Sequence, residues 1–258
     1  MDAVIRLPFS VVDGRVYVEA RVNGRGPYRF AVDTGASGMG RLDASMLATL
    51  GLHPSDRAAT SDAVKTVEVE TTHLDSLSLG SLERKDLDVI TRDYKKQATG
   101  DAAFDGILGR AFFSDGLLVI DYGRRQITFS TASRLSRDDS DALSYERAFR
   151  VPVRINGKLF EANIDTGANV SMVVPSHMWS GISSAPLERS GTGQLSNTKI
   201  ETSQGVVAGS VELSAVVLKD VDAKVSDRFP EILIGAHLMA SSILAIDQRS
   251  NTIAVCPI

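Results

Sequence analysis

The sequence predicts a mostly-β protein built from two similar lobes. Short runs of β-branched and apolar residues alternate with turn-forming residues along the chain, and long helical patterns are scarce. The tetrapeptide Asp-Thr-Gly-Ala occurs twice, at residues 33–36 and 165–168, each time at the end of a strand-like run. The segments around the two copies also follow one another in the same order. Together these observations indicate a duplicated β architecture.

Length and composition agree with two ordinary globular domains. The chain has 258 residues, which is enough for two domains of roughly 100 to 130 residues that each bury a core. Hydrophobic residues make up 43% and charged residues 23%, as is typical of soluble proteins. The net charge of −4 gives no basic surplus for binding nucleic acid or an anionic membrane. No window approaches the roughly 18 apolar residues of a membrane span.

The N-terminus carries no targeting pattern. Met1 to Arg6 lacks the charged and apolar regions of a signal peptide and enters a strand pattern almost at once. Two explanations stay open. The protein is cytosolic, or a leader has been removed from an exported or periplasmic protein. The compartment is therefore not predicted.

The first half begins with a predicted hairpin. Val4 to Val12 and Arg15 to Val22 have strand composition, and Asp13-Gly14 between them is a strong turn signal. After a second turn at residues 23–24, a further strand runs up to Asp33. The sequence therefore predicts that Asp33 ends a strand.

A short helix is predicted after this strand. Leu42 to Leu50 has an apolar side, Asp43 can cap its start, and Gly51 can end it. In the second half, Pro175 to Trp179 begins a shorter segment at the corresponding place.

The second half repeats the first. Phe149 to Ile155 is a predicted strand, a turn follows at residues 156–157, and Phe160 to Ile164 runs up to Asp165. Two later pairs of segments match at one common offset. They are Gly106 to Gly109 with Ile232 to Gly235, and Leu117 to Asp121 with Ile243 to Asp247. We therefore expect lobes at residues 1–130 and 148–258, joined by a polar linker at residues 131–147.

Two similar pentapeptides predict a covering hairpin in each lobe. Thr60–Val64 and Thr202–Val206 agree at three positions, and each precedes a strand pattern, at Thr66 to Glu70 and at Val206 to Leu213. The residues expected at the two tips are Ser61, Asp62 and Ala63 in the first lobe, and Ser203, Gln204 and Gly205 in the second.

The repeated tetrapeptide has a chemical interpretation. An aspartate at a strand end presents its carboxylate from rigid backbone, and a glycine two residues later permits a tight turn and close approach. If a two-fold axis relates the lobes, Asp33 and Asp165 face each other. Two carboxylates about 3 Å apart do not both ionise readily, so the pair shares a proton. Such a pair offers a base that activates water beside an acid that protonates a carbonyl oxygen.

These residues resemble the aspartic peptidases, in particular their retropepsin-like branch. In that family each lobe carries Asp-Thr/Ser-Gly, followed later by two apolar residues and a glycine. The alanines at positions 36 and 168 are typical of the retropepsin-like branch. The resemblance covers about residues 14 to 257, and it implies a bilobal acid-protease fold with two pseudo-two-fold-related lobes. Because both lobes lie in one chain, as in bacterial tandem retropepsin-like proteins, a monomer is expected.

The resemblance implies an aspartic endopeptidase. Asp33 and Asp165 would be catalytic, and the residues supporting the dyad would be Thr34, Gly35, Thr166 and Gly167. A polypeptide substrate would bind extended in the cleft, under the two hairpins. Because Gly205 is the only glycine at the two expected tips, the second hairpin is expected to be the more mobile cover.

Other functions remain open or are disfavoured. The fold could serve as a catalytically silent peptide-binding module, or as an obligate dimer with a scaffold role. The four histidines show no metal-ligand spacing, so no metal and no cofactor are expected. A lone Asp-Thr-Gly is usually only a turn. Its duplication favours the catalytic interpretation.

Overall fold

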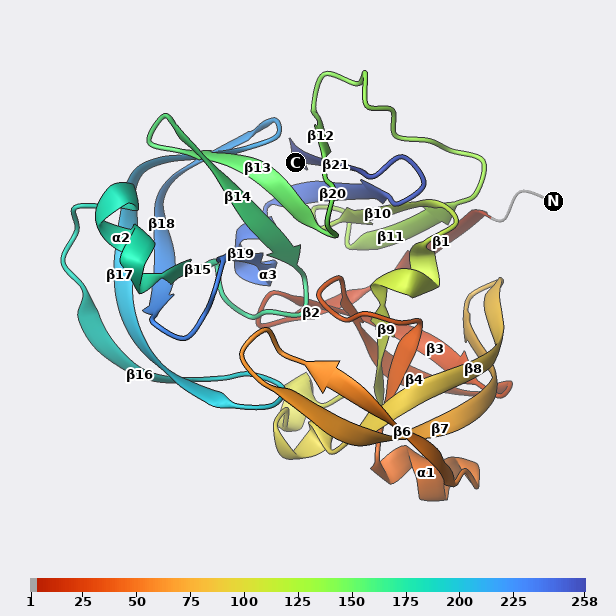
Figure 1. The fold of residues 1–258 in the computed structure, drawn as a ribbon. Coiled ribbons are helices and arrows are strands. Elements are labelled where there is room, and N and C mark those ends of the chain that lie inside the picture. The colour runs from red at the N-terminus through yellow and green to blue at the C-terminus, as the bar shows by residue number, and fades with distance from the viewer. Residues whose placement is uncertain (1–3) are drawn as a thin grey trace.

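Two barrel-like lobes lie side by side in the computed structural model, which describes residues 4–258 (Figure 1). Residues 1–3, the start of the segment that lacks a targeting pattern, lie outside the described residues. Strands dominate, so the predicted mostly-β class is confirmed. Within residues 4–258, no helix is both long and apolar enough to cross a membrane.

The first lobe is a single curved sheet. Its strands are β2 (Ser10–Val12), β3 (Arg15–Val22), β4 (Arg25–Asp33), β5 (Gly40–Asp43), β6 (Pro54–Ser61), β7 (Thr66–Leu79), β8 (Leu82–Arg92) and β9 (Gly106–Gly109). They are ordered β2-β3-β4-β9-β5-β8-β7-β6, and an additional β3–β7 pairing closes the sheet on itself. Its helical segments are α1 (Ser45–Leu50), η1 (Tyr94–Lys96), η2 (Gly100–Ala102) and η3 (Arg110–Phe113).

The second lobe repeats this plan. Its strands are β13 (Arg150–Ile155), β14 (Lys158–Asp165), β15 (Met172–Pro175), β16 (Glu188–Gln194), β17 (Lys199–Leu213), β18 (Val216–Ser226) and β19 (Ile232–Gly235). Their order is β13-β14-β19-β15-β18-β17-β16, and a β13–β17 pairing closes the sheet. Its helices are α2 (Ser176–Ile182) and α3 (Ala236–Met239).

A third sheet contains strands from both halves of the chain. Its members are β1 (Val4–Pro8), β10 (Leu117–Asp121), β11 (Gln126–Ser130), β12 (Ala142–Ser144), β20 (Ser242–Asp247) and β21 (Thr252–Pro257). The order is β1-β11-β10-β20-β21-β12, so β10 of the first half pairs directly with β20 of the second. This shared sheet fixes the two lobes relative to each other.

The register places the two repeated motifs at equivalent points. Strand β4 runs parallel to β9 and pairs Asp33 with Gly109, while β14 runs parallel to β19 and pairs Asp165 with Gly235. Each aspartate therefore ends a buried strand beside the apolar segment that ends in glycine. These later segments therefore support the aspartate loops by direct strand pairing.

The predicted elements mostly match the observed ones. The strand expected at Arg15–Val22 has those bounds, and the matched segment Leu117–Asp121 forms strand β10. The predicted helix begins later than expected, because Leu42 belongs to β5 and α1 starts at Ser45. Asp43 is not the cap residue, because Ala44 stands between it and the helix and makes no side-chain cap. The Asp43 carboxylate does accept the Ser45 amide at 3.0 Å.

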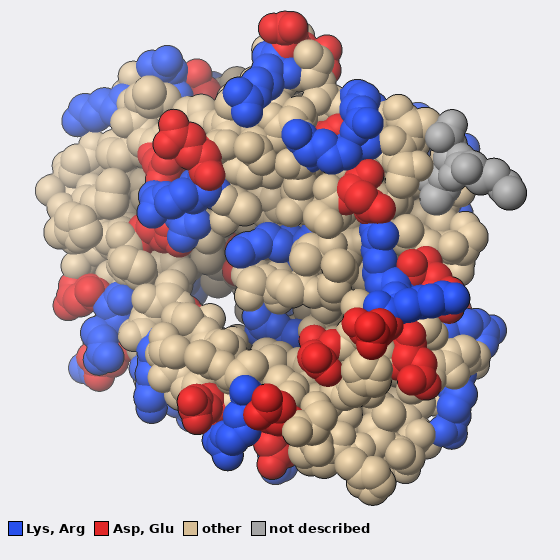
Figure 2. Space-filling model, turned by 45° about the vertical axis from the view of Figure 1, so that its right-hand side comes forward, with Lys and Arg blue, Asp and Glu red and all other residues tan. Residues whose placement is uncertain are grey.

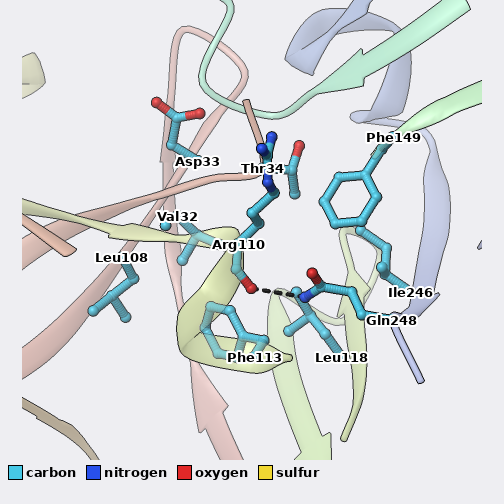
Figure 3. Close-up of a pocket in the computed structure, with 11 residues that line it drawn as sticks. Val32, Asp33, Thr34, Leu108, Arg110, Phe113, Leu118, Phe149, Ile246 and Gln248 are labelled. Atoms are coloured by element: carbon cyan, nitrogen blue, oxygen red, sulfur yellow. Dashed lines mark hydrogen bonds between the residues drawn. The ribbon is translucent and has the colours of Figure 1, made fainter. Parts of the chain in front are cut away.

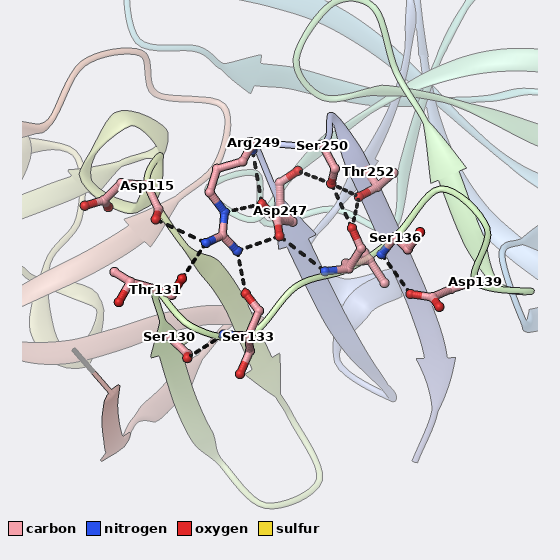
Figure 4. A network of polar contacts seen from close by, with 11 residues as sticks. Asp115, Ser130, Thr131, Ser133, Ser136, Asp139, Asp247, Arg249, Ser250 and Thr252 are labelled. Atoms are coloured by element: carbon pink, nitrogen blue, oxygen red, sulfur yellow. Dashed lines mark hydrogen bonds and ion pairs between the residues drawn. The ribbon is translucent and has the colours of Figure 1, made fainter. Parts of the chain in front are cut away.

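A buried ion pair ties the polar connecting segment to the shared sheet (Figure 4). Asp247 is fully buried and accepts Arg249 Nε at 2.7 Å and the Leu135 amide at 3.2 Å. The Arg249 guanidinium also donates to the carbonyls of Thr131 and Ser133. Burial opposes ionisation of Asp247, but its hydrogen bonds with Arg249 and nearby backbone amides outweigh this and hold its pKa below the usual value.

We expect Arg249→Met to lower the free energy of unfolding by about 3 kcal/mol at pH 7, because it leaves a buried carboxylate uncompensated. Arg124→Met is the matched control, because Arg124 pairs with Asp121, the counterpart of Asp247. The Arg124 side chain is 77% exposed, so this substitution should cost less than about 1 kcal/mol. Urea unfolding measures both. Because the pKa of Asp247 is lowered on folding, the contribution of the pair is fully present above the ordinary Asp pKa of about 4 and is lost as the pH falls from there through the lower pKa of the folded state. Equal losses in the two variants at pH 7, or a difference that grows as the pH falls below about 4, would contradict the assignment.

Candidate active site

Two threonines join the repeated motifs across the seam between the lobes. Thr34 Oγ1 donates to the Ile164 carbonyl at 3.1 Å, and Thr166 Oγ1 donates to the Val32 carbonyl at 2.8 Å. Each hydroxyl also accepts the backbone amide of the other threonine, at 3.0 and 3.1 Å. Both threonines are buried, so these four hydrogen bonds form without competition from water. These bonds fix the positions of the aspartate before each threonine and of the glycine after it.

The two predicted aspartates meet above the glycines of the opposite motif. A Cβ added to Gly35 would lie 2.5 Å from Asp165 Cγ, and a Cβ on Gly167 would collide in the same way with Asp33 Cγ. Each carboxylate therefore occupies the space that a side chain at the opposing glycine would fill. The structure brings together all six predicted dyad residues: Asp33, Thr34, Gly35, Asp165, Thr166 and Gly167.

Hydrogen bonds from the loops orient both carboxylates. Asp33 Oδ1 accepts the Ala36 amide at 2.9 Å, and Asp165 Oδ1 accepts the Gly167 amide at 2.8 Å. Burial raises the pKa of Asp165 to about 7, assisted by the charge of Asp33 and a hydrogen bond with it. The Gly167 amide and the Arg15 charge act in the opposite direction but are outweighed. The pair therefore retains a proton well above the usual aspartate range.

Beneath the first aspartate, polar and aromatic side chains fill the seam between the lobes (Figure 3). The Arg110 side chain extends to Thr34, between Asp33 and Phe149, and the Arg110 carbonyl accepts Gln248 Nε2 at 2.7 Å. Burial and the nearby Arg150 lower the pKa of Arg110, while the charge of Asp33 raises it. The charge of Asp33 thus acts on the Arg110 guanidinium as well as on the opposing carboxylate.

A polar clamp that the sequence reasoning missed holds the second motif from the first lobe. Arg15 Nε donates to the Gly167 carbonyl at 2.6 Å and its terminal nitrogen donates to Asn169 at 3.1 Å. Asp13 accepts Asn169 Nδ2 at 2.5 Å and lies 2.8 Å from His237 Nε2. The Asp13-Gly14 turn predicted the local hairpin, but nothing in the sequence indicated its partners more than 150 residues away.

The predicted tip of the second hairpin is wrong. Ser203, Gln204 and Gly205 lie within β17, where Gln204 pairs with Glu188 and Gly205 pairs with Ala223 of β18. A Cβ at position 205 would lie 2.6 Å from the ring of Trp179, so this glycine serves packing rather than motion. The match between the two pentapeptides was therefore coincidental. Gly205 gives no reason to expect the second hairpin to be the more mobile one.

The two hairpin tips contact each other. In the first lobe, Ser61, Asp62 and Ala63 do lie at the end of the β6–β7 hairpin; in the second, the β16–β17 turn spans residues 195–198. The Asn197 amide donates to Asp62 at 2.6 Å, and Asn197 Nδ2 donates to the carbonyls at positions 60 and 65.

Further contacts reinforce this link between the lobes. Arg92 donates to the Ser196 carbonyl at 2.6 Å and to the Asn197 side chain. Val64 packs against an apolar cluster of the second lobe that contains Ile200, Phe229 and Leu233. The hairpins therefore bridge the two lobes.

Within the described part of the chain, no group of three His, Cys, Asp or Glu side chains could hold a metal ion. Trp179 is buried in the core of the second lobe and donates its Nε1 hydrogen to the Ala185 carbonyl at 3.1 Å. Trp179 therefore belongs to the core of the second lobe and not to the site between the lobes.

We expect Thr34→Val to cost about 1–3 kcal/mol of stability, because it leaves the Thr166 amide and the Ile164 carbonyl buried without their partner. Thr34→Ser keeps the hydroxyl and removes one methyl group, so it should cost only about 1 kcal/mol. Denaturant unfolding of both variants compares the two losses. If the valine variant is as stable as the serine variant, the cross-lobe bonds do not hold the seam together.

We expect Asn197→Ala to loosen the contact between the hairpin tips, because it removes the two bonds that its side chain donates and the one that it accepts from Arg92. Amide hydrogen exchange at residues 60–65 and 195–198 should accelerate by about 5- to 30-fold, with the shared sheet unchanged. Ser196→Ala is the matched control, since only the backbone carbonyl of Ser196 accepts a bond from Arg92. Unchanged exchange at residues 60–65 in Asn197→Ala would count against a link between the tips.

Comparison with known proteins agrees with this geometry. The family model described as "Aspartyl protease" matches residues 18–112 and again residues 151–238, one match in each half and most of the chain in total. No curated protein matches the chain. The two matched segments contain both repeated motifs and both of the glycine-ending apolar strands that pair with them. The chain belongs to the aspartyl protease family.

Proposed function

We propose that the protein is an aspartic endopeptidase that hydrolyses peptide bonds with a water molecule activated between Asp33 and Asp165. The observation that carries the proposal is the meeting of the two carboxylates, each above the glycine of the opposite motif. The raised pKa of Asp165 supports it, because the pair then holds one proton near neutral pH.

The chemistry follows from that single proton. Asp33, the base of the pair, accepts a proton from the bound water as the water attacks the carbonyl carbon. Asp165, protonated, donates to the carbonyl oxygen. Collapse of the tetrahedral intermediate breaks the carbon–nitrogen bond, and the nitrogen leaves with a proton from the pair. The threonine bonds and the Gly35 and Gly167 backbones hold the carboxylates in position, which removes reorganisation from the barrier.

The substrate is an extended polypeptide. Figure 2 shows a hollow between the two lobes, and the hairpin tips bridge those lobes through Asn197 and Asp62. An extended chain in this space can bond to strand edges and place alternate side chains on either side. Release of the tips from each other admits it. Both aspartates come from one chain, so a monomer suffices for activity.

Asp33→Asn and Asp165→Asn should each lower kcat for an unfolded protein substrate by at least about 1,000-fold, since each removes one partner of the acid–base pair. Asp75→Asn, a change at an exposed carboxylate of β7, is the control and should leave kcat unchanged. The wild-type protein should also bind a statine-type inhibitor. Inhibitor binding without cleavage by wild type would instead favour the silent peptide-binding module.

The pH dependence of kcat/KM should show loss of activity as pH rises through about 7. The pKa of Asp165 is raised, so the proton that the carbonyl oxygen receives is held up to that pH and absent above it. Activity at lower pH falls once the pair takes up a second proton and no base remains. Peptide hydrolysis followed from pH 3 to pH 9 measures this profile. Full activity at pH 9 would exclude Asp165 as the acid.

A further inference from the structure

The first lobe carries an arginine at a position where the second lobe has an apolar residue. Arg41 of β5 pairs with Ile107 of β9, and Val173 of β15 pairs with Leu233 of β19. Ile107 and Leu233 are themselves equivalent, because each lies two residues before the glycine opposite its aspartate. The fold therefore accepts valine at this position. The arginine of the first lobe is not required by the architecture.

Arg41 is buried without a counterion. Arg41 is only 8% exposed, and its Nε has no hydrogen-bond partner among the described residues. The Tyr94 hydroxyl is also buried, and the Arg41 guanidinium acts on it through its charge and as a hydrogen-bond donor, so the two groups are neighbours. A buried guanidinium that faces only a neutral phenol is costly unless something else supplies a charged acceptor.

The nearby carboxylates are engaged elsewhere. Asp43 accepts the Ser45 hydroxyl and the Lys95 amide, while Asp105 accepts the Arg29 amide and pairs with Lys95. Asp62 is bonded to the Asn197 amide at the hairpin tips. None of the ion pairs among residues 4–258 includes Arg41.

Arg41 and Tyr94 lie close to the proposed dyad. The face that carries Tyr94 and Ile107 also includes Ala36, whose amide binds Asp33. The charge of Asp33 acts on the Tyr94 hydroxyl, and the charge of Arg41 acts on Arg92 and Arg110. Arg41, Arg92 and Arg110 therefore gather positive charge near the dyad, and Figure 2 shows Lys and Arg side chains on the margin of the hollow between the lobes.

We propose that Arg41 and Tyr94 form a subsite that receives an acidic side chain of the polypeptide substrate, on the first-lobe side of the bond that is cleaved. The inference rests on the proposed peptidase function and adds its specificity. The planar guanidinium can bind a carboxylate through two parallel hydrogen bonds, and the phenol supplies a further donor. The second lobe offers no equivalent, since Val173 there packs against the apolar cluster that contacts Val64. We therefore expect the protein to prefer substrates with an acidic residue on one side of the cleaved bond and an apolar residue on the other.

The experiment compares peptides that differ only by Glu or Gln at each position flanking the cleaved bond. Wild type should cleave the Glu peptide with a kcat/KM about 10- to 100-fold higher at one position, as expected for charged hydrogen bonds in a desolvated site. Arg41→Met and Arg41→Val should reduce this ratio to near one. Arg134→Met, a change at an exposed arginine of the connecting segment, should retain the full ratio.

Three results would overturn the inference while leaving the peptidase intact: equal cleavage of Glu and Gln peptides by wild type at every position, a ratio that survives in Arg41→Met, or a ratio that falls equally in Arg134→Met. The wild-type comparison stands even if the Arg41 variants fail to fold, which thermal unfolding reveals. Binding of the same peptide pairs to Asp33→Asn gives the ratio without hydrolysis. Tighter binding of Glu peptides without any cleavage by wild type would refute the proposed function and support the subsite.

Discussion

Two carboxyl groups, each partly exposed to solvent, have to be held against each other across the seam, and the rest of the molecule is arranged around that constraint. Left free, Asp33 and Asp165 would separate or both become hydrated. The four hydrogen bonds of Thr34 and Thr166 prevent this by joining the strand ends on which the aspartates stand. The shared sheet, through the pairing of β10 with β20, holds the lobes at the spacing that those short bonds require.

The duplication accounts for the paired carboxylates, and the differences between the halves make the two carboxylates inequivalent. A symmetric pair would have no reason to favour one carboxylate as the acid. Here Arg15 reaches from the first lobe to the Gly167 carbonyl, and Arg110 lies on the Asp33 side of the seam. Arg41 occupies a position on β5 where the second lobe has Val173 on β15. The two lobes thus share a backbone plan but differ in the side chains around the seam.

The sequence predicted the parts of the fold that depend on local pattern. The Asp-Thr-Gly repeats, the strands beside them and the glycine-ending apolar segments follow from turn chemistry and strand periodicity, and the structure places them as expected. The second hairpin tip was wrong because register in a long hairpin is set by pairing partners. Gly205 pairs with Ala223, and the local resemblance to residues 60–64 carries no information about that.

Contacts between distant segments could not be predicted from one sequence. Arg15 and Asn169, or Asn197 and Asp62, are separated by more than 130 residues, and each is an ordinary surface residue type. Arg41 likewise appears in the sequence as one of two charged residues in a four-residue strand. Its burial and its unpartnered Nε become visible only when the fold brings Ile107 and Tyr94 around it.

The claim that one proton is shared across the seam is tested most directly by carbon NMR of the aspartate carboxyl groups, titrated from pH 3 to pH 9. Spectra of Asp33→Asn and Asp165→Asn assign the two signals. We expect one carboxyl carbon to keep its protonated chemical shift until about pH 7, and the Asp165 signal to titrate at lower pH once the facing charge is removed in Asp33→Asn. Two independent titrations near pH 4, unchanged by either substitution, would contradict the account.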